Sequence, residues 1–249
     1  MAAATVKNIA YRPQQNRVTG LGKASAADEE TMRAVLQRYA FSVERFLQTV
    51  LAPYAGHWQL DYASFRPMEE SQRKLRTRAR NDLLHVDSFP TRATNGKRIL
   101  RVFTNVHPTQ PRVWATGDPF EGLLGRFGQE LPAYRPDDPA TVDAWLPTLA
   151  RRMAKRLGFK DGSRSAYDRW MLDFHNFLKE HAAFQAEARK DTWHFSPRSS
   201  WIAFTDSVSH SVLSGQYAVE QTLLVDPKGL VRPERAPLEQ LRRFYGEKG

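Results

Sequence analysis

The 249-residue chain contains no cysteine, which excludes disulfides and thiolate metal ligands alike. It also has no apolar run that approaches the roughly 18 residues needed to span a bilayer. Its N-terminus, MAAATVKNIAYRPQQN, lacks the continuous apolar core of a signal peptide. These three absences predict a soluble, cytosolic protein.

Acidic residues are in deficit, because 27 Asp and Glu stand against 37 Lys and Arg and leave a formal net charge of +10. A charge of this size attracts polyanions, which include nucleic acid, an anionic membrane surface, and phosphorylated or carboxylated ligands. The charge alone does not choose among them. A hydrophobic content of 41% is typical of globular proteins, and the length suits one domain over residues 1–249.

Apolar residues recur at helical spacing in three stretches, at about 25–52, 139–157 and 164–187. We expect Ser25 to cap the first helix, since acidic residues follow it in the first turn. Strands are expected at 98–106 and in the last third of the chain, in SSWIAFTD, SHSVLSG and QYAVEQTLLV. Gly215 is expected to form a hairpin turn or a bulge between the last two. This order predicts a mainly β protein with an antiparallel core and flanking α-helices.

Basic side chains fall on alternate positions in residues 74–80, which predicts a strand with one basic face: Lys74, Arg76, Arg78 and Arg80. That face is either an anion-binding wall or a solvated edge that discourages aggregation. Residues 107–135 are rich in Pro and Gly and are expected to form loops. The helix at 139–157 has a basic outer face at 151–156, which is either solvated or in contact with a membrane.

The most informative motif is His85-Val86-Asp87. In an extended segment, side chains two residues apart lie on the same side, so this imidazole and carboxylate can converge on one ion. Non-haem Fe(II) sites use two histidines and one carboxylate on one face of an octahedron, leaving the other positions open. A His-x-Asp pair alone is weak evidence, because it also arises by chance.

His210 is the best placed residue to complete such a site, because it lies in a predicted strand, SVSHSVLSG. His57 and His107 remain alternatives, and His194 is a weaker one. His175 and His181 lie beside the apolar stripe of a predicted helix and are expected to be helix-surface or supporting residues rather than ligands.

Arg101 lies in the middle of the apolar strand RILRVFTNV. A cation there is costly to bury unless an anion meets it, so we interpret Arg101 as a ligand-binding residue. Asn105 lies on the same face of that strand and is expected to contact the same ligand or to orient the metal ligands.

Three blocks of sequence resemble a known family: KNIAYRP, DLLHVDSFPTRATNGKRILRVFTN and SSWIAFTDSVSHSVLSGQYAVEQTLLV. They are similar to the Kdo hydroxylases, which are Fe(II)- and 2-oxoglutarate-dependent dioxygenases acting on the sugar 3-deoxy-D-manno-oct-2-ulosonic acid (Kdo) in lipopolysaccharide precursors. The resemblance covers most of the chain. Family members carry an extra segment ahead of the KNIAYRP block that is nearly absent here, as expected of a trimmed chain.

The resemblance implies a double-stranded β-helix (jelly-roll, cupin-like) core, iron held by His85, Asp87 and His210, and O2 and 2-oxoglutarate as co-substrates. It further implies hydroxylation of Kdo at C3 in Kdo-lipid A, giving the sugar Ko, at the cytoplasmic face of the inner membrane of a Gram-negative bacterium.

Many members of the wider superfamily bind 2-oxoglutarate through an Arg about ten residues after the second histidine, but that position here is Glu220. Some branches of the superfamily place this cation on the strand that follows the loop, so the resemblance implies that Arg101 binds the co-substrate's far carboxylate, with Asn105 beside it. Arg76, Arg78 and Arg80 are the candidates for binding the anionic substrate.

Two other functions use the same residues in part. One is a hydroxylase of the same fold that acts on another anionic substrate. The other is a non-catalytic basic β-barrel that binds anionic glycan or nucleic acid through the +10 charge, although it leaves His85, Asp87 and His210 unexplained.

Overall fold

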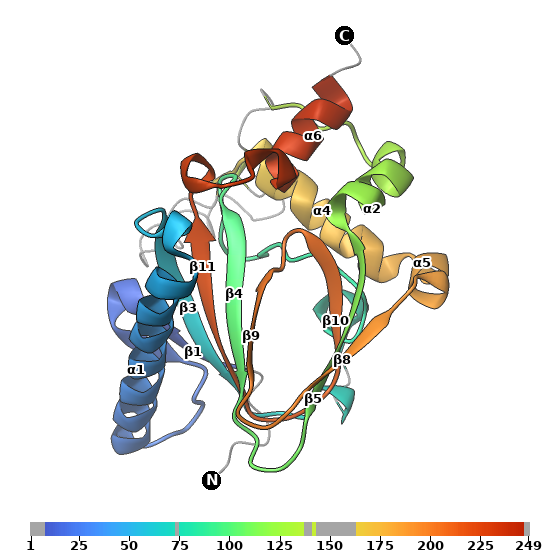
Figure 1. The fold of residues 1–249 in the computed structure, drawn as a ribbon. Coiled ribbons are helices and arrows are strands. Elements are labelled where there is room, and N and C mark those ends of the chain that lie inside the picture. The colour runs from blue at the N-terminus through green and yellow to red at the C-terminus, as the bar shows by residue number, and fades with distance from the viewer. Residues whose placement is uncertain (1–7, 73–74, 137–140, 143–162, 247–249) are drawn as a thin grey trace.

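Two antiparallel β-sheets face each other in the computed structural model of the protein, with one long helix on the outer side of the larger sheet and further helices at one end of the pair (Figure 1). The structure describes residues 8–72, 75–136, 141–142 and 163–246. This arrangement matches the predicted mainly β fold with flanking helices, and the facing sheets form its jelly-roll core.

The larger sheet has the strand order β2-β1-β3-β11-β4-β9, and the smaller sheet has the order β10-β5-β8. The strands of the larger sheet are β1 (Ile9–Arg12), β2 (Arg17–Thr19), β3 (Trp58–Arg66), β4 (Arg98–Asn105), β9 (Ser200–Phe204) and β11 (Ala218–Val225). Those of the smaller sheet are β5 (Arg112–Pro119), β8 (Asp191–Phe195) and β10 (Val208–Ser214). Two short strands, β6 (Thr141–Val142) and β7 (Ser163–Arg164), pair separately.

Helix α1 (Ala26–Val50) packs on the outer face of the larger sheet. It begins as predicted at Ser25, whose hydroxyl accepts a hydrogen bond from the Asp28 amide in a capping box. Leu36 and Leu47 are buried against the sheet because they repeat at helical spacing on its inner side. Val35 and Phe46 are apolar as well, but about half of each is exposed.

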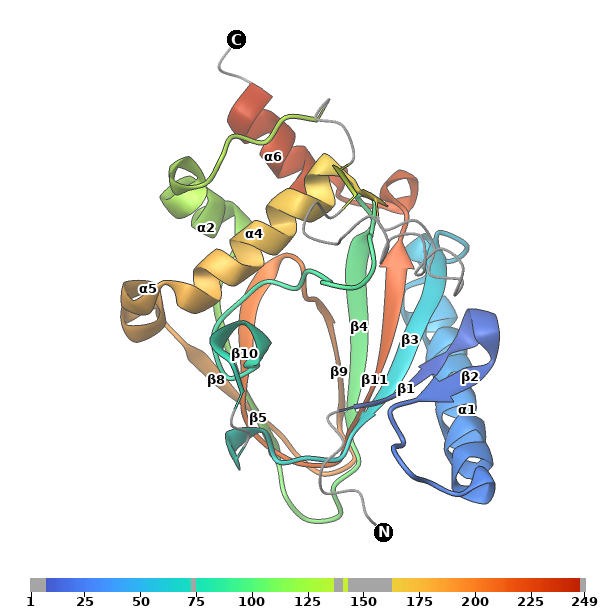
Figure 2. The ribbon, with the colours of Figure 1, turned by 180° about the vertical axis from the view of Figure 1, so that it is seen from behind.

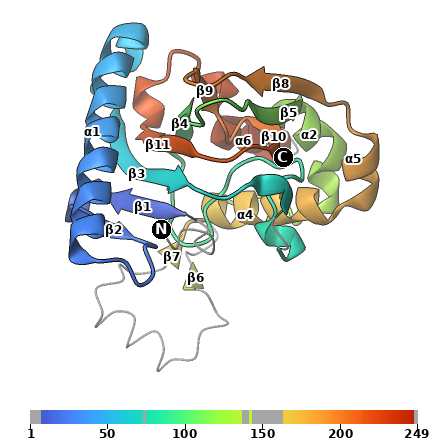
Figure 3. The same ribbon diagram turned by 90° about the horizontal axis from the view of Figure 1, so that it is seen from below.

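The remaining helices lie on the other side of the molecule from α1 (Figures 2 and 3). They are α2 (Phe120–Phe127), α4 (Ala166–Glu180), α5 (Ala182–Glu187) and α6 (Pro237–Gly246). Their apolar side chains form one core together with Leu84 and Val86. The predicted helix at 164–187 is two helices, because the backbone of His181 is extended. The His181 ring then accepts a hydrogen bond from the Phe184 amide and caps the start of α5.

The hairpin predicted at Gly215 is wrong. β10 and β11 belong to different sheets, since β10 pairs with β5 while β11 pairs with β3 and β4. Gly215 has a positive φ of 120° where the chain crosses between the sheets.

Three other expectations need correction. Residues 77–79 form a 3-10 helix in place of the predicted basic strand. The predicted loops at 107–135 contain β5 and α2. Most of the predicted helix at 139–157, with its basic face at 151–156, lies outside the described residues, and Thr141–Val142 within it form β6.

Among the described residues, none of the helices combines the length and the apolar character that crossing a membrane requires.

Candidate active site

A backbone ladder brings His85 and His210 together. The His85 amide donates to the His210 carbonyl at 3.1 Å, and the His210 amide donates to the His85 carbonyl at 2.9 Å. Residues that pair in this way lie directly opposite each other, with side chains on the same face. The Asp87 amide continues the ladder by donating to the Thr205 carbonyl at 2.8 Å. The extended segment around His85 is therefore held against β10 by backbone bonds.

Successive side chains of that segment point alternately into the helical core and away from it. Leu84 and Val86 are fully buried in the helical core, so the intervening His85 and Asp87 point the other way. One ligand atom from each of His85, Asp87 and His210 lies within 4.8 Å of the others. Asp87 Oδ1 is 3.6 Å from His85 Nε2 and 3.9 Å from His210 Nε2. The described residues hold no second group of this kind.

The hydrogen bonds of the two rings fix which nitrogen faces the cavity. Nδ1 of His85 lies 2.7 Å from the Leu83 carbonyl, and Nδ1 of His210 lies 3.0 Å from the Val208 carbonyl. A carbonyl can only accept, so each Nδ1 carries a proton and each Nε2 presents a lone pair. Burial and then the charge of Lys179 lower the pKa of His85 well below 6.5, and burial also lowers the pKa of His210.

The carboxylate of the group is ionised. Burial alone would raise the pKa of Asp87, but the Arg101 guanidinium beside it holds that pKa well below its usual range. Two neutral imidazoles and one carboxylate are the donors that non-haem Fe(II) prefers. The residues present therefore fit an iron ion by their chemistry.

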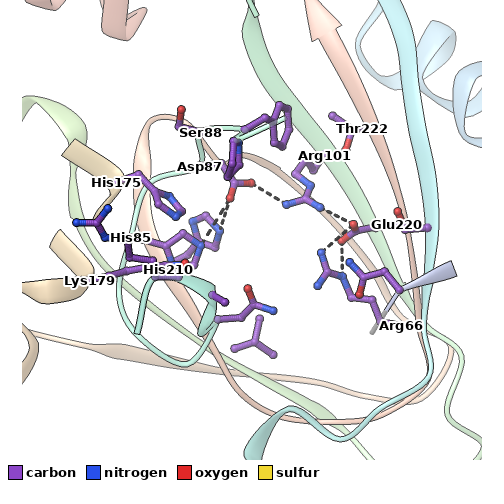
Figure 4. A pocket seen from close by; sticks show the side chains of 18 of the residues that line it. Arg66, His85, Asp87, Ser88, Arg101, His175, Lys179, His210, Glu220 and Thr222 are labelled. Atoms are coloured by element: carbon purple, nitrogen blue, oxygen red, sulfur yellow. Dashed lines mark hydrogen bonds and ion pairs between the residues drawn. The ribbon is translucent and has the colours of Figure 1, made fainter. Parts of the chain in front are cut away.

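A cavity of about 810 Å³ opens between the two sheets at this group. Residues of both sheets line it, including Arg66 and Thr222 from the larger sheet and Trp114 from the smaller one. Figure 4 shows His85, Asp87 and His210 between two groups of polar residues. His175 and Lys179 lie on one side, and Arg101, Glu220 and Arg66 lie on the other.

Buried charges of alternating sign continue from Asp87 across the cavity wall. Arg101 Nη1 is 2.7 Å from Asp87 Oδ2, and Arg101 Nη2 is 2.5 Å from Glu220 Oε1. Glu220 also accepts two hydrogen bonds from Arg66, at 2.8 and 2.9 Å. Burial alone would raise the pKa of Glu220, but Arg101 and Arg66 lower it to about 2.

The chain of charges ends at Glu70 and Arg112. Glu70 Oε1 is 3.8 Å from Arg66 and 3.7 Å from Arg112. Burial lowers the pKa of Arg112 to about 10. Three anions and three cations thus alternate from Asp87 to Arg112, and the network is neutral.

Two residues expected to bind the co-substrate have different positions. Arg101 lines the cavity, but the anions that meet its guanidinium within the protein are Asp87 and Glu220. Asn105 is fully buried and does not line the cavity. Its amide donates to the Gln110 and Phe195 carbonyls, and its oxygen accepts from the His107 amide. Asn105 was expected to contact the co-substrate, but these bonds hold its side chain at the turn after β4, away from the cavity.

The three arginines expected to bind the substrate do not all line the cavity. Arg76 and Arg78 line the cavity mouth and are exposed, and Arg78 is paired with Glu180 at 2.7 Å. Arg80 does not line the cavity, because its guanidinium turns to Asp82. The loss of the predicted strand explains the difference, since a 3-10 turn does not keep alternate residues on one face.

The other histidines considered as metal ligands do not join this group. The His107 ring stacks on Tyr217, and His57 and His194 are exposed. His175 was expected to be a supporting residue, and its ring lies 4.9 Å from that of His85, centroid to centroid. Its Nδ1 lies 2.7 Å from the Val86 carbonyl, between the two residues of the His-x-Asp motif.

Lys179, Glu220 and Arg66 also line the cavity, and the sequence did not predict them there. The spacing of His175 and Lys179, four residues apart on one helix, was the available signal for the first of them. Glu220 and Arg66 carry no local signal, because they meet only when β11 pairs with β3.

The chain is similar to proteins of known structure over most of its length. A family model for 3-deoxy-D-manno-oct-2-ulosonic acid (Kdo) hydroxylase matches residues 1–248. A crystal structure of the Kdo hydroxylase KdoO, a non-haem Fe(II) α-ketoglutarate-dependent dioxygenase in complex with α-ketoglutarate and Fe(III), superposes with a TM-score of 0.82 at 33% identity, covering 96% of this chain and 77% of that one. The apo structure of KdoO gives a TM-score of 0.82 at 32% identity, covering 99% and 81%. Comparison with curated proteins finds no match.

Proposed function

The chain belongs to the Kdo hydroxylase family and is an Fe(II)- and 2-oxoglutarate-dependent dioxygenase, and we propose that His85, Asp87 and His210 hold its iron. The observation that carries this proposal is the backbone ladder that sets His85 opposite His210, with Asp87 two residues along the same face. When bound there with 2-oxoglutarate and O2, iron supplies the oxidation of a substrate C–H bond to an alcohol, with succinate and CO2 as co-products.

The protein's own contribution at this centre is orientation. Arg101 holds Asp87 Oδ2, which leaves Oδ1 directed at the two imidazoles. The Nδ1 bonds of His85 and His210 keep both Nε2 lone pairs facing the same point. The ligands are thus prepared by bonds that do not depend on the metal.

We propose that the far carboxylate of 2-oxoglutarate binds on the Arg101 side of the centre. Arg101 lines the cavity, and its Nε is buried without a hydrogen-bond partner among the described residues. Arg66 adds a second guanidinium next to it through Glu220. The dianionic co-substrate and the iron dication carry opposite charges of equal size, so the neutral wall of the cavity stays balanced when both are bound.

We propose Kdo-lipid A as the substrate, hydroxylated at C3 of Kdo to give Ko, with residues 1–249 acting as one dioxygenase domain. Arg76 and Arg78 at the cavity mouth are placed to meet the phosphates of lipid A, whereas Arg80 is not. Because this substrate is a membrane glycolipid, we propose that the enzyme works at the cytoplasmic face of the inner membrane, where a net charge of +10 favours an anionic surface.

The test is the mass of the product. Purified protein with Fe(II), 2-oxoglutarate, O2 and Kdo-lipid A should yield a product heavier by one oxygen, together with an equal amount of succinate. Asp87→Ala should abolish both products and the weak visible absorption of the anaerobic Fe(II)–2-oxoglutarate complex. Succinate formation by Asp87→Ala at the wild-type rate would show that the iron ligands are misassigned. Succinate without any gain of oxygen on Kdo-lipid A would point to another anionic substrate.

A further inference from the structure

Helix α4 presents two polar side chains to the cavity on the side away from Arg101. His175 and Lys179 are four residues apart, so they lie on the same face of the helix, one turn from each other. Both are buried, and both line the cavity. Figure 4 shows them beside His85, opposite Arg101 and Glu220.

Lys179 is an uncommon residue for such a position. Lysine is among the side chains least often buried, yet only 4% of Lys179 is exposed. Its Nζ donates to the Arg78 carbonyl at 3.2 Å. After burial, its positive charge is the largest cause of the lowered pKa of both His85 and His175.

The chemistry of the sugar limits where its carboxylate can bind. Kdo carries its carboxylate at C1, and a single carbon separates that group from C3. When C3 faces the iron, the carboxylate must therefore lie beside the iron ligands and not at the cavity mouth. Arg76 and Arg78 are exposed at the mouth, and Arg101 is engaged by Asp87 and Glu220 on the proposed co-substrate side.

We propose that Lys179 binds the C1 carboxylate of Kdo and thereby directs C3 toward the iron ligands. This inference rests on the proposed function, and it names the group that recognises the substrate as an acid. His175 complements Lys179, because its Nδ1 donates to the Val86 carbonyl and its Nε2 lone pair faces the cavity. That lone pair repels a carboxylate but accepts a hydrogen bond from a sugar hydroxyl.

The experiment compares two ligands that differ only in charge: the methyl glycoside of Kdo and the carboxamide made from it. Their binding to the anaerobic Fe(II)–2-oxoglutarate enzyme is measured by calorimetry. Wild type should bind the acid about 10- to 100-fold more tightly than the amide, as expected for a charge-assisted hydrogen bond in a buried site. Lys179→Met should bind both ligands about equally, and Lys179→Arg should restore part of the preference.

The matched control is Arg80→Met, which removes a nearby cation that does not line the cavity and should keep the wild-type preference. A purely structural role for Lys179 would lower stability in Lys179→Met without removing the preference for the acid. The inference is overturned if Lys179→Met keeps that preference, or if wild type shows none. The proposed function fails by a different result, the absence of any oxygen gain on Kdo-lipid A with wild type.

Discussion

The His175 ring is buried where α4 packs on the segment from His85 to Asp87, and this makes its protonation costly. Burial and then the charge of Lys179 lower the pKa of His175 from 6.5 to about 4. Above pH 6.5 the ring is neutral in both folded and unfolded protein. Between pH 6.5 and 4 the unfolded chain binds a proton that the folded protein does not, so stability falls as the pH falls through this window.

We therefore expect the metal-free protein to lose free energy of unfolding between pH 7 and pH 5, with about 2 kcal/mol of the loss due to His175. Asn can still donate to the Val86 carbonyl but does not titrate, so His175→Asn should lose about that much less over the same interval. Urea unfolding at both pH values measures the difference. His194→Asn, a change at an exposed position, serves as the control, and equal losses in all three proteins would refute the assignment.

Arg101 and Asn105 lie on the same strand, and the sequence suggested the same role for both. The structure separates them, since Arg101 lines the cavity and Asn105 bonds to the turn after β4. Arg101→Met should weaken 2-oxoglutarate binding about 10- to 100-fold at saturating Fe(II), because a charge-assisted bond is lost. Asn105→Ala should leave that affinity unchanged and lower the free energy of unfolding by about 1–3 kcal/mol.

Anaerobic titration of the Fe(II)–2-oxoglutarate absorption measures the first effect, and chemical denaturation measures the second. An unchanged co-substrate affinity in Arg101→Met would show that another residue of the cavity wall binds the far carboxylate of 2-oxoglutarate. Arg66 would be the next candidate. A weakened affinity in Asn105→Ala would restore the role that the sequence suggested for it.

At the scale of elements, the crossover from β10 to β11 depends on one glycine. Gly215 has φ of 120°, and a Cβ at this position would lie 2.9 Å from the Arg112 Cα. Gly215→Ala should therefore lower the free energy of unfolding by about 1–3 kcal/mol or more, from backbone strain and from this contact. Because the crossover connects the strand of His210 to the strand of Glu220, the affinity for iron should fall as well.

Gly125→Ala is the matched control, because Gly125 lies in α2 with no atom within 4 Å of an added Cβ. It should stabilise the protein by about 0.5–1 kcal/mol. Thermal unfolding of the two variants gives the comparison. Similar stability in both would mean that the crossover tolerates a side chain.

The sequence predicted elements well where the pattern was local and uninterrupted. The apolar repeat and Ser25 located α1, and the β-branched and aromatic run located β4. β5 was not predicted, because Pro111 and Pro119 lie at its two ends and proline is typical of loops. The Gly215 signal was seen, but a local turn cannot tell a hairpin from a crossover. That choice depends on strands more than 90 residues away, since β10 pairs with β5.

The candidate site divides in the same way. The spacing of His85 and Asp87 and the predicted strand of His210 made these three residues the candidates, and the structure brings them together. The reasoning that a buried Arg101 needs an anion was sound, but it did not foresee that Glu220 and Asp87 would supply two. These ion pairs form only when β4 pairs with β11 and the segment from His85 to Asp87 packs beside them.

At the scale of the whole molecule, the excess positive charge of the described residues lies outside the core. Among the described residues, buried acidic side chains number six and buried basic side chains five, so the interior nearly cancels. The positive excess of the described residues is therefore carried by groups that are not buried, where salt screens it. Binding of an anionic glycolipid should depend on ionic strength, whereas chemistry at the buried centre should depend on it little.

Arg76 provides the sharpest test, because it is an exposed cation at the cavity mouth. With Kdo-lipid A in mixed micelles of a non-ionic detergent, the KM of wild type should rise as NaCl is increased from low to high concentration. Arg76→Met should raise the KM about fivefold at low salt and reduce its salt dependence, since one cation near an anionic headgroup contributes about 1 kcal/mol. Arg80→Met should behave like wild type, because Arg80 is already paired with Asp82. The Kdo methyl glycoside lacks phosphates, so its KM should respond little to salt or to either variant. An equal response of both substrates to salt would contradict a role for the mouth in binding phosphate.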